Sequence, residues 1–385
     1  LVLRRQRQMC IRDRLISVAF PDMVVAAPTV TGRLSLQCEA IASDSCTIRS
    51  LDWERSRFDI EFGLRNGTTY NSFLVRGERT ALIDTSHAKF RDTWIPLLQE
   101  QIDPQTIDLL IVSHTEPDHS GLIGDLLDLN PEIEIVGSKV AIQFLENQVH
   151  RPFKSRAVKS GDELDLGTNR DSGVSHRFEF LSAPNLHWPD TIFSFDHGTG
   201  VLYTCDAFGL HYCSDDVFDC DPGAIAPDFR FYYDCLMGPN ARSVLQALKR
   251  MDALPEINTI AVGHGPLLRE HLQHWIDDYR TWSGQRSKGE SYAAVCYLSQ
   301  YGFSDRISQA IAHGIGKAEA QVQLVDLRAT DPQELTALIG DAKAVVVPTW
   351  PAEPDSDLQA AIGTLLAALG PKQTCLLYTS PSPRD

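Results

Sequence analysis

The string SHTEPDHSG, residues 113–121, constrains the fold of this chain more than any other segment. It follows the short apolar run IDLLIVSH, typical of a buried β-strand, and precedes SGLIGDLLDLN, whose apolar residues recur at helical spacing. The string is therefore predicted to form a loop between a strand and a helix. Four side chains that can bind metal ions lie within six residues of this loop: His114, Glu116, Asp118 and His119. We infer that the loop is part of a metal site.

Three further candidate ligands also follow predicted strands. His187 comes after RFEFLSAP, Asp206 ends VLYTCDA, and His264 lies in NTIAVGHG. Loops that follow strands meet at one rim of a sheet sandwich, where active sites are common. A lone histidine is more often a packed or surface residue than a ligand. One four-ligand loop combined with three ligands at strand ends is a different pattern, and it predicts a shared site.

Seven ligands are enough for two cations. Two divalent ions a few ångströms apart repel each other and need carboxylates between them, and Asp206 is our candidate for the bridging group. Imidazole and carboxylate ligands that leave open positions suit iron sites that handle oxygen.

The C-terminal part of the chain shows a second pattern. SGQRSKGE, residues 283–290, is polar and lacks apolar periodicity, so it is predicted to be an interdomain linker. Beyond it, the strand-like segments SYAAVCYL, QVQLVDL and AKAVVVP alternate with predicted helices near 303–316 and 332–339. This alternation predicts a parallel α/β domain.

Length and composition exclude several classes of protein. A chain of 385 residues suggests two domains of ordinary size. A net charge of −16 argues against a nucleic-acid partner, and no apolar run approaches the roughly 20 residues of a membrane-spanning helix. The nine cysteines are an odd number without a Cys-x-x-Cys motif. They are expected to be reduced thiols in a reducing compartment, and they argue against cysteine-bound iron–sulfur sites.

The two ends of the chain differ from the rest. Residues 1–22 hold five arginines and two aspartates, as a transit peptide could. The preferred interpretation is that RQRQMCIRDR and LLYTSPSPRD are translated sequencing-adapter sequence. Segments 1–22 and 375–385 are therefore expected to be a leader and a tail outside the fold.

The motif His-x-Glu-x-Asp-His with distant His, Asp and His resembles the flavodiiron branch of the metallo-β-lactamase superfamily. The resemblance covers roughly residues 30–370. RSLDWERSRFDIEFGLRNGTTYNSFLVRGERTALIDTSH and FRFYYDCLMGPNARSV are most similar to the cyanobacterial and plant-type members. It implies an α/β fold: a metallo-β-lactamase-like αββα sandwich over 30–282, the linker 283–290, and an incomplete flavodoxin-like domain over 291–374.

The same resemblance implies the ligand set of a diiron centre. One iron would be bound by His114, Glu116 and His187, and the other by Asp118, His119 and His264, with Asp206 bridging the two. Hydrolytic members of the superfamily typically have histidine where this chain has Glu116. The additional anionic oxygen favours iron over zinc.

An FMN cofactor is also implied, although the third flavin loop of the family is missing and binding in this chain is expected to be weak or lost. A helix N-terminus after a strand can hold the FMN phosphate. The residues that resemble the phosphate loop are Ser299, Tyr301, Gly302 and Ser304, and those that resemble the loop beside the flavin ring are Pro348, Thr349 and Trp350.

The implied function is the reduction of dioxygen to water. This reaction takes four electrons, of which two ferrous ions supply two and a reduced flavin the others. The implied electron donor is NAD(P)H or a reduced carrier. The implied assembly is a head-to-tail homodimer, or a hetero-oligomer with a paralogue, in the cytoplasm or in the chloroplast stroma of a eukaryote.

Three other functions remain open from the sequence. The same cofactors can reduce nitric oxide. The same fold can carry a di-zinc hydrolase that uses metal-bound hydroxide, against which Glu116 and the flavodoxin-like segment argue. A non-catalytic partner subunit is disfavoured by seven intact ligand positions.

Overall fold

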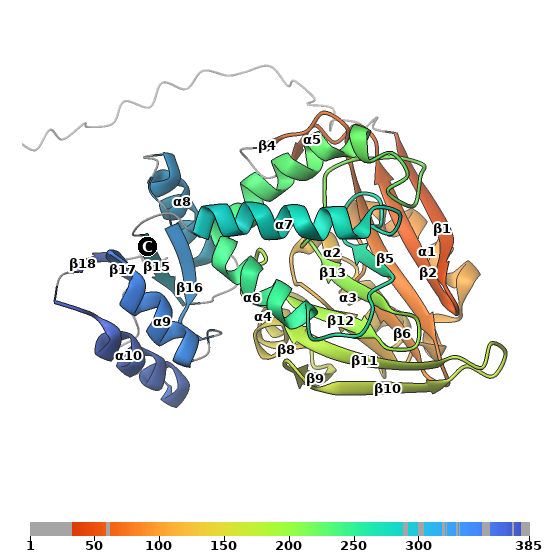
Figure 1. Cartoon of the computed structure of the whole chain (residues 1–385). Coiled ribbons are helices and arrows are strands. Elements are labelled where there is room, and N and C mark those ends of the chain that lie inside the picture. Colours follow the sequence, from red (N-terminus) through yellow and green to blue (C-terminus); the bar gives the residue numbers. More distant parts are fainter. Residues whose placement is uncertain are drawn as a thin grey trace, which may run out of the picture. The chain divides into compact units, whose positions relative to one another are not determined.

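The computed structural model describes residues 33–58, 62–287, 292–298, 304–317, 320, 322–328, 330, 332–348, 355–371 and 373–378. Its larger part is built on two sheets (Figure 1). In spatial order, the seven strands of the first sheet are β1 (Leu34–Ala42), β2 (Ser45–Asp52), β5 (Thr68–Arg76), β6 (Thr80–Ile83), β7 (Leu109–Val112), β8 (Glu134–Ser138) and β9 (Lys154–Val158). Strands β1 to β6 pair antiparallel, and β6 to β9 pair parallel. A separate two-stranded pair consists of β3 (Arg57–Phe58) and β4 (Phe62–Gly63).

The second sheet has five strands. In spatial order they are β10 (Glu163–Thr168), β11 (Ser175–Ser182), β12 (Ile192–Asp196), β13 (Val201–Cys205) and β14 (Thr259–Val262). Strands β13 and β14 pair parallel, so that both end at the same edge of the sheet.

One hydrophobic core joins the two sheets. Phe73 and Ile111 from the first sheet share a buried cluster with Phe180 and Tyr203 from the second. The rings of Phe73 and Tyr203 lie 5.1 Å apart between centroids. Each fully buried side chain of this size contributes about 1.5 to 3 kcal/mol, so the contact between the sheets contributes substantially to the stability of this part of the chain.

Helices cover the outer faces of both sheets. Trp94 and Leu98 of α1 (Arg91–Gln101) and Leu126 of α3 (Ile123–Leu129) share a second buried cluster with the first sheet, to which α4 (Lys139–Val149) also belongs. The helices α5 (Pro222–Tyr232), α6 (Ala241–Met251) and α7 (Leu272–Ser287) pack with the second sheet. The predicted αββα sandwich is confirmed.

The C-terminal part is a parallel α/β unit. Its four strands run in the order β16 (Val322–Asp326), β15 (Ala293–Tyr297), β17 (Ala344–Pro348) and β18 (Thr374–Tyr378). On one face α8 (Ser304–Lys317) packs, and on the other α9 (Pro332–Asp341) and α10 (Ser356–Ala368). This arrangement agrees with the predicted flavodoxin-like domain.

Two predicted segment boundaries differ from the structure. Helix α7 continues to Ser287, so residues 283–287 of the predicted linker are helical and residues 288–290 lie outside the described part. Ser283 is buried and its hydroxyl contacts the Tyr233 hydroxyl at 2.9 Å, which ties the end of α7 to the sandwich. Residues 375–378 of the predicted tail belong to β18, which completes its backbone hydrogen bonds against β17. Residues 1–32 and 379–385 lie outside the described part.

Among the described residues, no helix combines the length and the apolar composition that crossing a membrane requires.

A buried histidine of the second sheet contacts the turn between β1 and β2 of the first sheet. His176 of β11 contacts Asp196 of β12 at 2.8 Å, and its other ring nitrogen lies 3.4 Å from Asp44 in the turn between β1 and β2. Burial alone would lower the pKa of His176, but the two carboxylates raise it above its usual value. When it is protonated, the ring pairs with a carboxylate of each sheet.

We expect this pairing to make stability depend on pH. Because the folded-state pKa of His176 lies above the unfolded value of about 6.5, its contribution is fully present below pH 6.5 and is lost as the pH rises through the raised pKa. The His176→Gln variant should lose about 2 kcal/mol of unfolding free energy at pH 5.5 and less at pH 9. Urea unfolding of both proteins measures the difference, and an equal difference at both pH values would contradict the assignment.

Candidate metal centre

All seven predicted ligand residues lie at the ends of strands. His114 to His119 follow β7, where α2 (Pro117–Ser120) begins directly after Glu116. His187 lies in the loop between β11 and β12. Asp206 directly follows β13, and His264 comes two residues after β14. The paired carboxyl ends of β13 and β14 bring these last two residues together, and the packing of the sheets brings the β7 loop against them.

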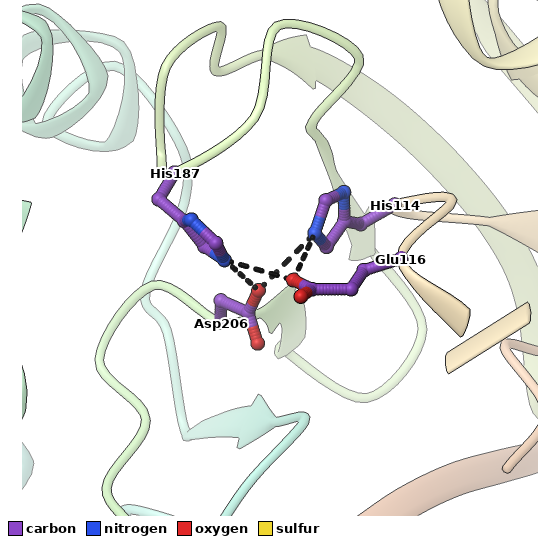
Figure 2. A group of neighbouring side chains, drawn as sticks. All are labelled: His114, Glu116, His187 and Asp206. Atoms are coloured by element: carbon purple, nitrogen blue, oxygen red, sulfur yellow. Dashed lines mark hydrogen bonds and ion pairs between the residues drawn. The ribbon is translucent and has the colours of Figure 1, made fainter. Parts of the chain in front are cut away.

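The structure forms one group from His114, Glu116, His187 and Asp206, whose ligand atoms converge on one point (Figure 2). Oε2 of Glu116 lies 3.2 Å from Nε2 of His114 and 3.0 Å from Nε2 of His187. Oδ2 of Asp206 lies 3.4 and 3.2 Å from the same two nitrogens.

A second group consists of Asp118, His119 and His264. Nε2 of His119 lies 3.6 Å from Asp118, and Nε2 of His264 lies 3.4 Å from it. Both nitrogens also face Oδ1 of Asp206, at 3.1 and 3.3 Å. One carboxylate oxygen of Asp206 thus points to each group, which is the placement that a bridging ligand needs.

The spacing of these atoms fits metal coordination. Two ligand atoms that each lie about 2.1 Å from one cation are about 3.0 to 3.4 Å apart when the bond angle is about 90 to 110°. Seven of the eight distances above lie in that range. Both carboxylate oxygens of Asp118 and Nε2 of His264 are buried without a hydrogen bond of good geometry to any described residue. Unpaired buried polar atoms are costly, and cations at the two points would satisfy them.

Three ligand carboxylates and four histidines face each other at the site. Burial alone would raise the pKa of Asp118 and of Asp206, but neighbouring histidines hold both below the usual range. The same pairs act on the histidines: burial would lower their pKa, but Asp206 with Glu116 raises the pKa of His187 to about 10, and Asp118 with Asp206 raises that of His264 to about 10. The carboxylates therefore favour positive charge at this position, either as protons on the rings or as cations.

Three residues that the sequence interpretation did not identify hold the ligands in place. Nδ1 of His114 lies 3.0 Å from Oδ1 of Asp190, and the backbone N–H and hydroxyl of Thr115 donate to Oδ2 of Asp190 at 2.8 and 2.6 Å. Nδ1 of His264 donates to the Thr69 carbonyl at 2.6 Å. These contacts leave Nε2 of each ring free for a metal. Asp190 lies three residues after His187 in NLHWPD, but the ring it contacts is that of His114, 76 residues earlier, so no local sequence signal marks this role.

His211 is a second buried histidine beside the ligands that was not predicted. Its ring centroid lies 4.9 Å from that of His264, and its Nδ1 lies 2.9 Å from the Thr68 hydroxyl. Burial, reinforced by His264, lowers the pKa of His211 well below its usual value. Its ring is therefore neutral and adds no charge to the site.

A glycine permits the close packing of the two loops. A Cβ atom at Gly263 would lie 2.7 Å from Cε1 of His119 and 3.2 Å from the Cys205 backbone. Any side chain at this position would push the His119 ring away from Asp206.

Most of the predicted FMN residues lie outside the described part of the chain: Ser299, Tyr301, Gly302, Thr349 and Trp350. Ser304 begins α8 and Pro348 ends β17, so both predicted loops follow strands of the parallel sheet. The roles of these seven residues stay predictions.

Comparison with known proteins places this geometry in a family. Residues 68–265 match the model of the ODP family of beta-lactamase domains. The chain is 58% identical over 348 residues to diflavin flavoprotein A 1 from Synechocystis sp.. That match covers 90% of this chain and 60% of the relative, so the chain spans less than two thirds of that protein.

Solved structures show the same fold. The metal-soaked Flv1 flavodiiron core from Synechocystis sp. PCC6803 is 32% identical, with a TM-score of 0.75, over 90% of this chain and 85% of that one. Rubredoxin oxygen:oxidoreductase from Desulfovibrio gigas is 23% identical, with a TM-score of 0.61, over 89% of this chain and 85% of that one, and at this identity only the fold is shared. The chain belongs to the flavodiiron proteins, within the ODP family of beta-lactamase-fold proteins.

Proposed function

We propose that this chain is the core of a flavodiiron oxidoreductase that reduces dioxygen to water at a diiron centre, with electrons passed through FMN. The observation that carries the proposal is the position of Asp206, whose two carboxylate oxygens face two separate groups of ligands. When bound, the two irons and the flavin would together supply the four electrons that dioxygen needs.

The chain's own residues would hold and orient the two irons. His114, Glu116 and His187 would bind one, Asp118, His119 and His264 the other, and Asp206 would bridge them. Asp190 holds the ring of His114 through Nδ1. The ring is therefore already oriented with Nε2 towards the position that the iron would occupy.

Burial supports a small, uncharged substrate. The side chains of His114, His119 and His264 are 0% exposed, and Glu116, the most exposed ligand, is 14% exposed. A diatomic molecule needs little access, whereas the transition state of amide or ester hydrolysis is bulky and carries developing negative charge. Three ligand carboxylates at the site would oppose that charge.

FMN, the electron donor and the assembly complete the proposal. FMN would bind at the loops that follow β15 and β17, and NAD(P)H or a reduced carrier would supply its electrons. The four-stranded parallel sheet after residue 292, with helices on both faces, supports the proposal of an FMN domain. We propose a head-to-tail homodimer, or a hetero-oligomer with a paralogue, and a location in the cytoplasm or the chloroplast stroma.

Nitric oxide is the alternative substrate, because it is also a small neutral molecule and its reduction uses the same cofactors. The di-zinc hydrolase is less well supported, because Glu116 places an anionic oxygen where zinc sites of this fold use a nitrogen.

The Glu116→His variant tests the metal and the reaction together. Protein expressed with iron and supplied with FMN and a chemical reductant should contain about two irons per chain and consume oxygen without accumulating hydrogen peroxide. Replacing the carboxylate by a neutral imidazole should lower iron content and reduce oxygen uptake at least about tenfold. Metal analysis and an oxygen electrode measure both, and nitric oxide consumption under anaerobic conditions compares the two substrates.

Glu146→His is the control, because Glu146 is exposed on α4 and belongs to none of the groups of described residues that could hold a metal. It should leave iron content and oxygen uptake unchanged. Two zincs per chain and no oxygen uptake, even after the C-terminal segments of the longer relatives are added, would favour the hydrolase.

The Asp190→Asn variant tests the carboxylate behind His114. The amide cannot accept hydrogen bonds from both the ring and Thr115 as the carboxylate does, so metal affinity should fall about 10- to 100-fold. Competitive titration against a chelator measures this affinity. Asp196→Asn is the control, because Asp196 is an equally buried partner of a histidine, His176, outside the ligand set. An equal loss of affinity in both variants would indicate general destabilisation.

A further inference from the structure

Two cysteines lie close together on the hairpin of β1 and β2, on the opposite face of the first sheet from the core that joins the sheets. In the antiparallel register, Ala40 is opposite Cys46 and Cys38 is opposite Ile48. Cys38 and Cys46 are therefore offset by two residues and point to the same face. Both pack in the cluster beneath α1, Cys46 buried and Cys38 partly exposed.

A cation contacts one of the two thiols. Nη1 of Arg76 lies 3.8 Å from Sγ of Cys46, and its Nη2 donates to the Gln101 carbonyl at the end of α1, which holds the guanidinium in place. The neighbouring Cys38 thiol, with help from Arg76 and against burial, lowers the pKa of Cys46 to about 6. Cys46 and burial raise the pKa of Cys38.

A lowered pKa distinguishes Cys46 from four other described cysteines. Cys205, Cys213, Cys235 and Cys296 are each at least partly buried, and burial raises the pKa of each thiol. Reactive cysteines carry thiolate character, lie beside a cation and have a resolving thiol nearby. Cys46 has the first two features, and Cys38, on the same face of the neighbouring strand, is the thiol that β1 would bring closer.

We propose that Cys38 and Cys46 form a reversible oxidation site, at which hydrogen peroxide converts the two thiols into a disulfide that joins β1 to β2. The Cys46 thiolate attacks one peroxide oxygen, the O–O bond breaks, and the departing hydroxide takes up a proton to form water. The Cys46 sulfur is then a sulfenic acid. The Cys38 sulfur attacks it, the S–S bond forms as the S–O bond breaks, and the oxygen leaves as a second water with the Cys38 proton. Two thiols and one peroxide thus give one disulfide and two waters.

The geometry indicates that this disulfide is easily reduced again. Residues offset by two on neighbouring antiparallel strands have Cα atoms about 7 to 8 Å apart, whereas disulfides span about 4.4 to 6.8 Å. Closing the bond therefore draws β1 towards β2 by about 1 Å. Strand β1 is at the edge of the sheet and pairs with β2 alone among the described strands, so no second strand opposes this shift. Disulfides under such tension are reduced more readily than relaxed ones.

The site is separate from the candidate metal centre. Cys46 is at the start of β2. At the other end of that strand, about 20 Å away, Asp52 accepts a hydrogen bond from Tyr70, whose ring lies 5.5 Å from that of the candidate ligand His264. The oxidation can therefore be tested on protein treated with a chelator, and its result does not depend on the proposed oxygen chemistry.

Peptide mapping by mass spectrometry is the test. The reduced protein is treated with hydrogen peroxide at one to two equivalents, alkylated and digested without reductant. A linked peptide pair containing Cys38 and Cys46 is expected as the first product, and dithiothreitol should restore both thiols. Oxidation of Cys220 or Cys375, the exposed described cysteines, before this pair would overturn the proposal, as would a pair that stays reduced.

Three variants test the individual roles. Cys38→Ser should stop the reaction at a Cys46 sulfenic acid, which dimedone traps. Arg76→Gln should slow disulfide formation about tenfold by weakening the thiolate. Cys235→Ser, which removes a half-buried thiol elsewhere, should leave the rate unchanged. Circular dichroism verifies folding, and the wild-type peptide map decides the proposal even if a variant misfolds. Unchanged rates in Arg76→Gln, or a Cys46 that dimedone fails to trap in folded Cys38→Ser, would contradict the assigned roles.

Discussion

The constraint on which this structure depends is the burial of four carboxylates, Glu116, Asp118, Asp190 and Asp206, within one small volume. Taking a carboxylate out of water costs several kcal/mol unless a positive group and hydrogen bonds compensate it. Here the compensation comes from histidines, and Nε2 of each of the four ligand histidines lies within 3.3 Å of a carboxylate oxygen. The strands that end at this rim are held by the core between the sheets. The free energy of packing this core offsets the cost of burying several carboxylates close together.

Much of the fold could be predicted because the residue pattern of each segment indicates how far that segment is buried. Strands such as β12 and β13 are buried along their whole length and appear in the sequence as short apolar runs. Prediction was weaker where tertiary contacts determine the secondary structure of a segment. The polar residues 283–287 form the end of α7 because Ser283 packs against Tyr233, and residues 375–378 become a strand because β17 offers an unpaired edge. Neither contact has a signal in the sequence nearby.

The same distinction applies to the site. The seven candidate ligands could be found because metal-binding residue types are rare in such spacing, and four of them lie in one loop. Asp190 and Thr69 could not be identified in this way. A carboxylate after a histidine, or a backbone carbonyl in a strand, has no special composition, and its role arises only when β5 and β12 bring it behind a ligand ring. The bridging position of Asp206 was inferred from charge repulsion, and the placement of its two oxygens agrees with that inference.

The charge of the whole molecule bears on which substrates can enter. The chain carries a formal charge of −16, and its candidate site adds buried carboxylates rather than lysine or arginine. Such a field draws cations to the site and slows the approach of anions. Bound cations would neutralise the local excess without reversing the field around the molecule. An anionic substrate would therefore face repulsion at long range, and dioxygen or nitric oxide would not. For the proposed function, charge and burial would thus favour the same class of substrate, a small neutral molecule, by independent physical means.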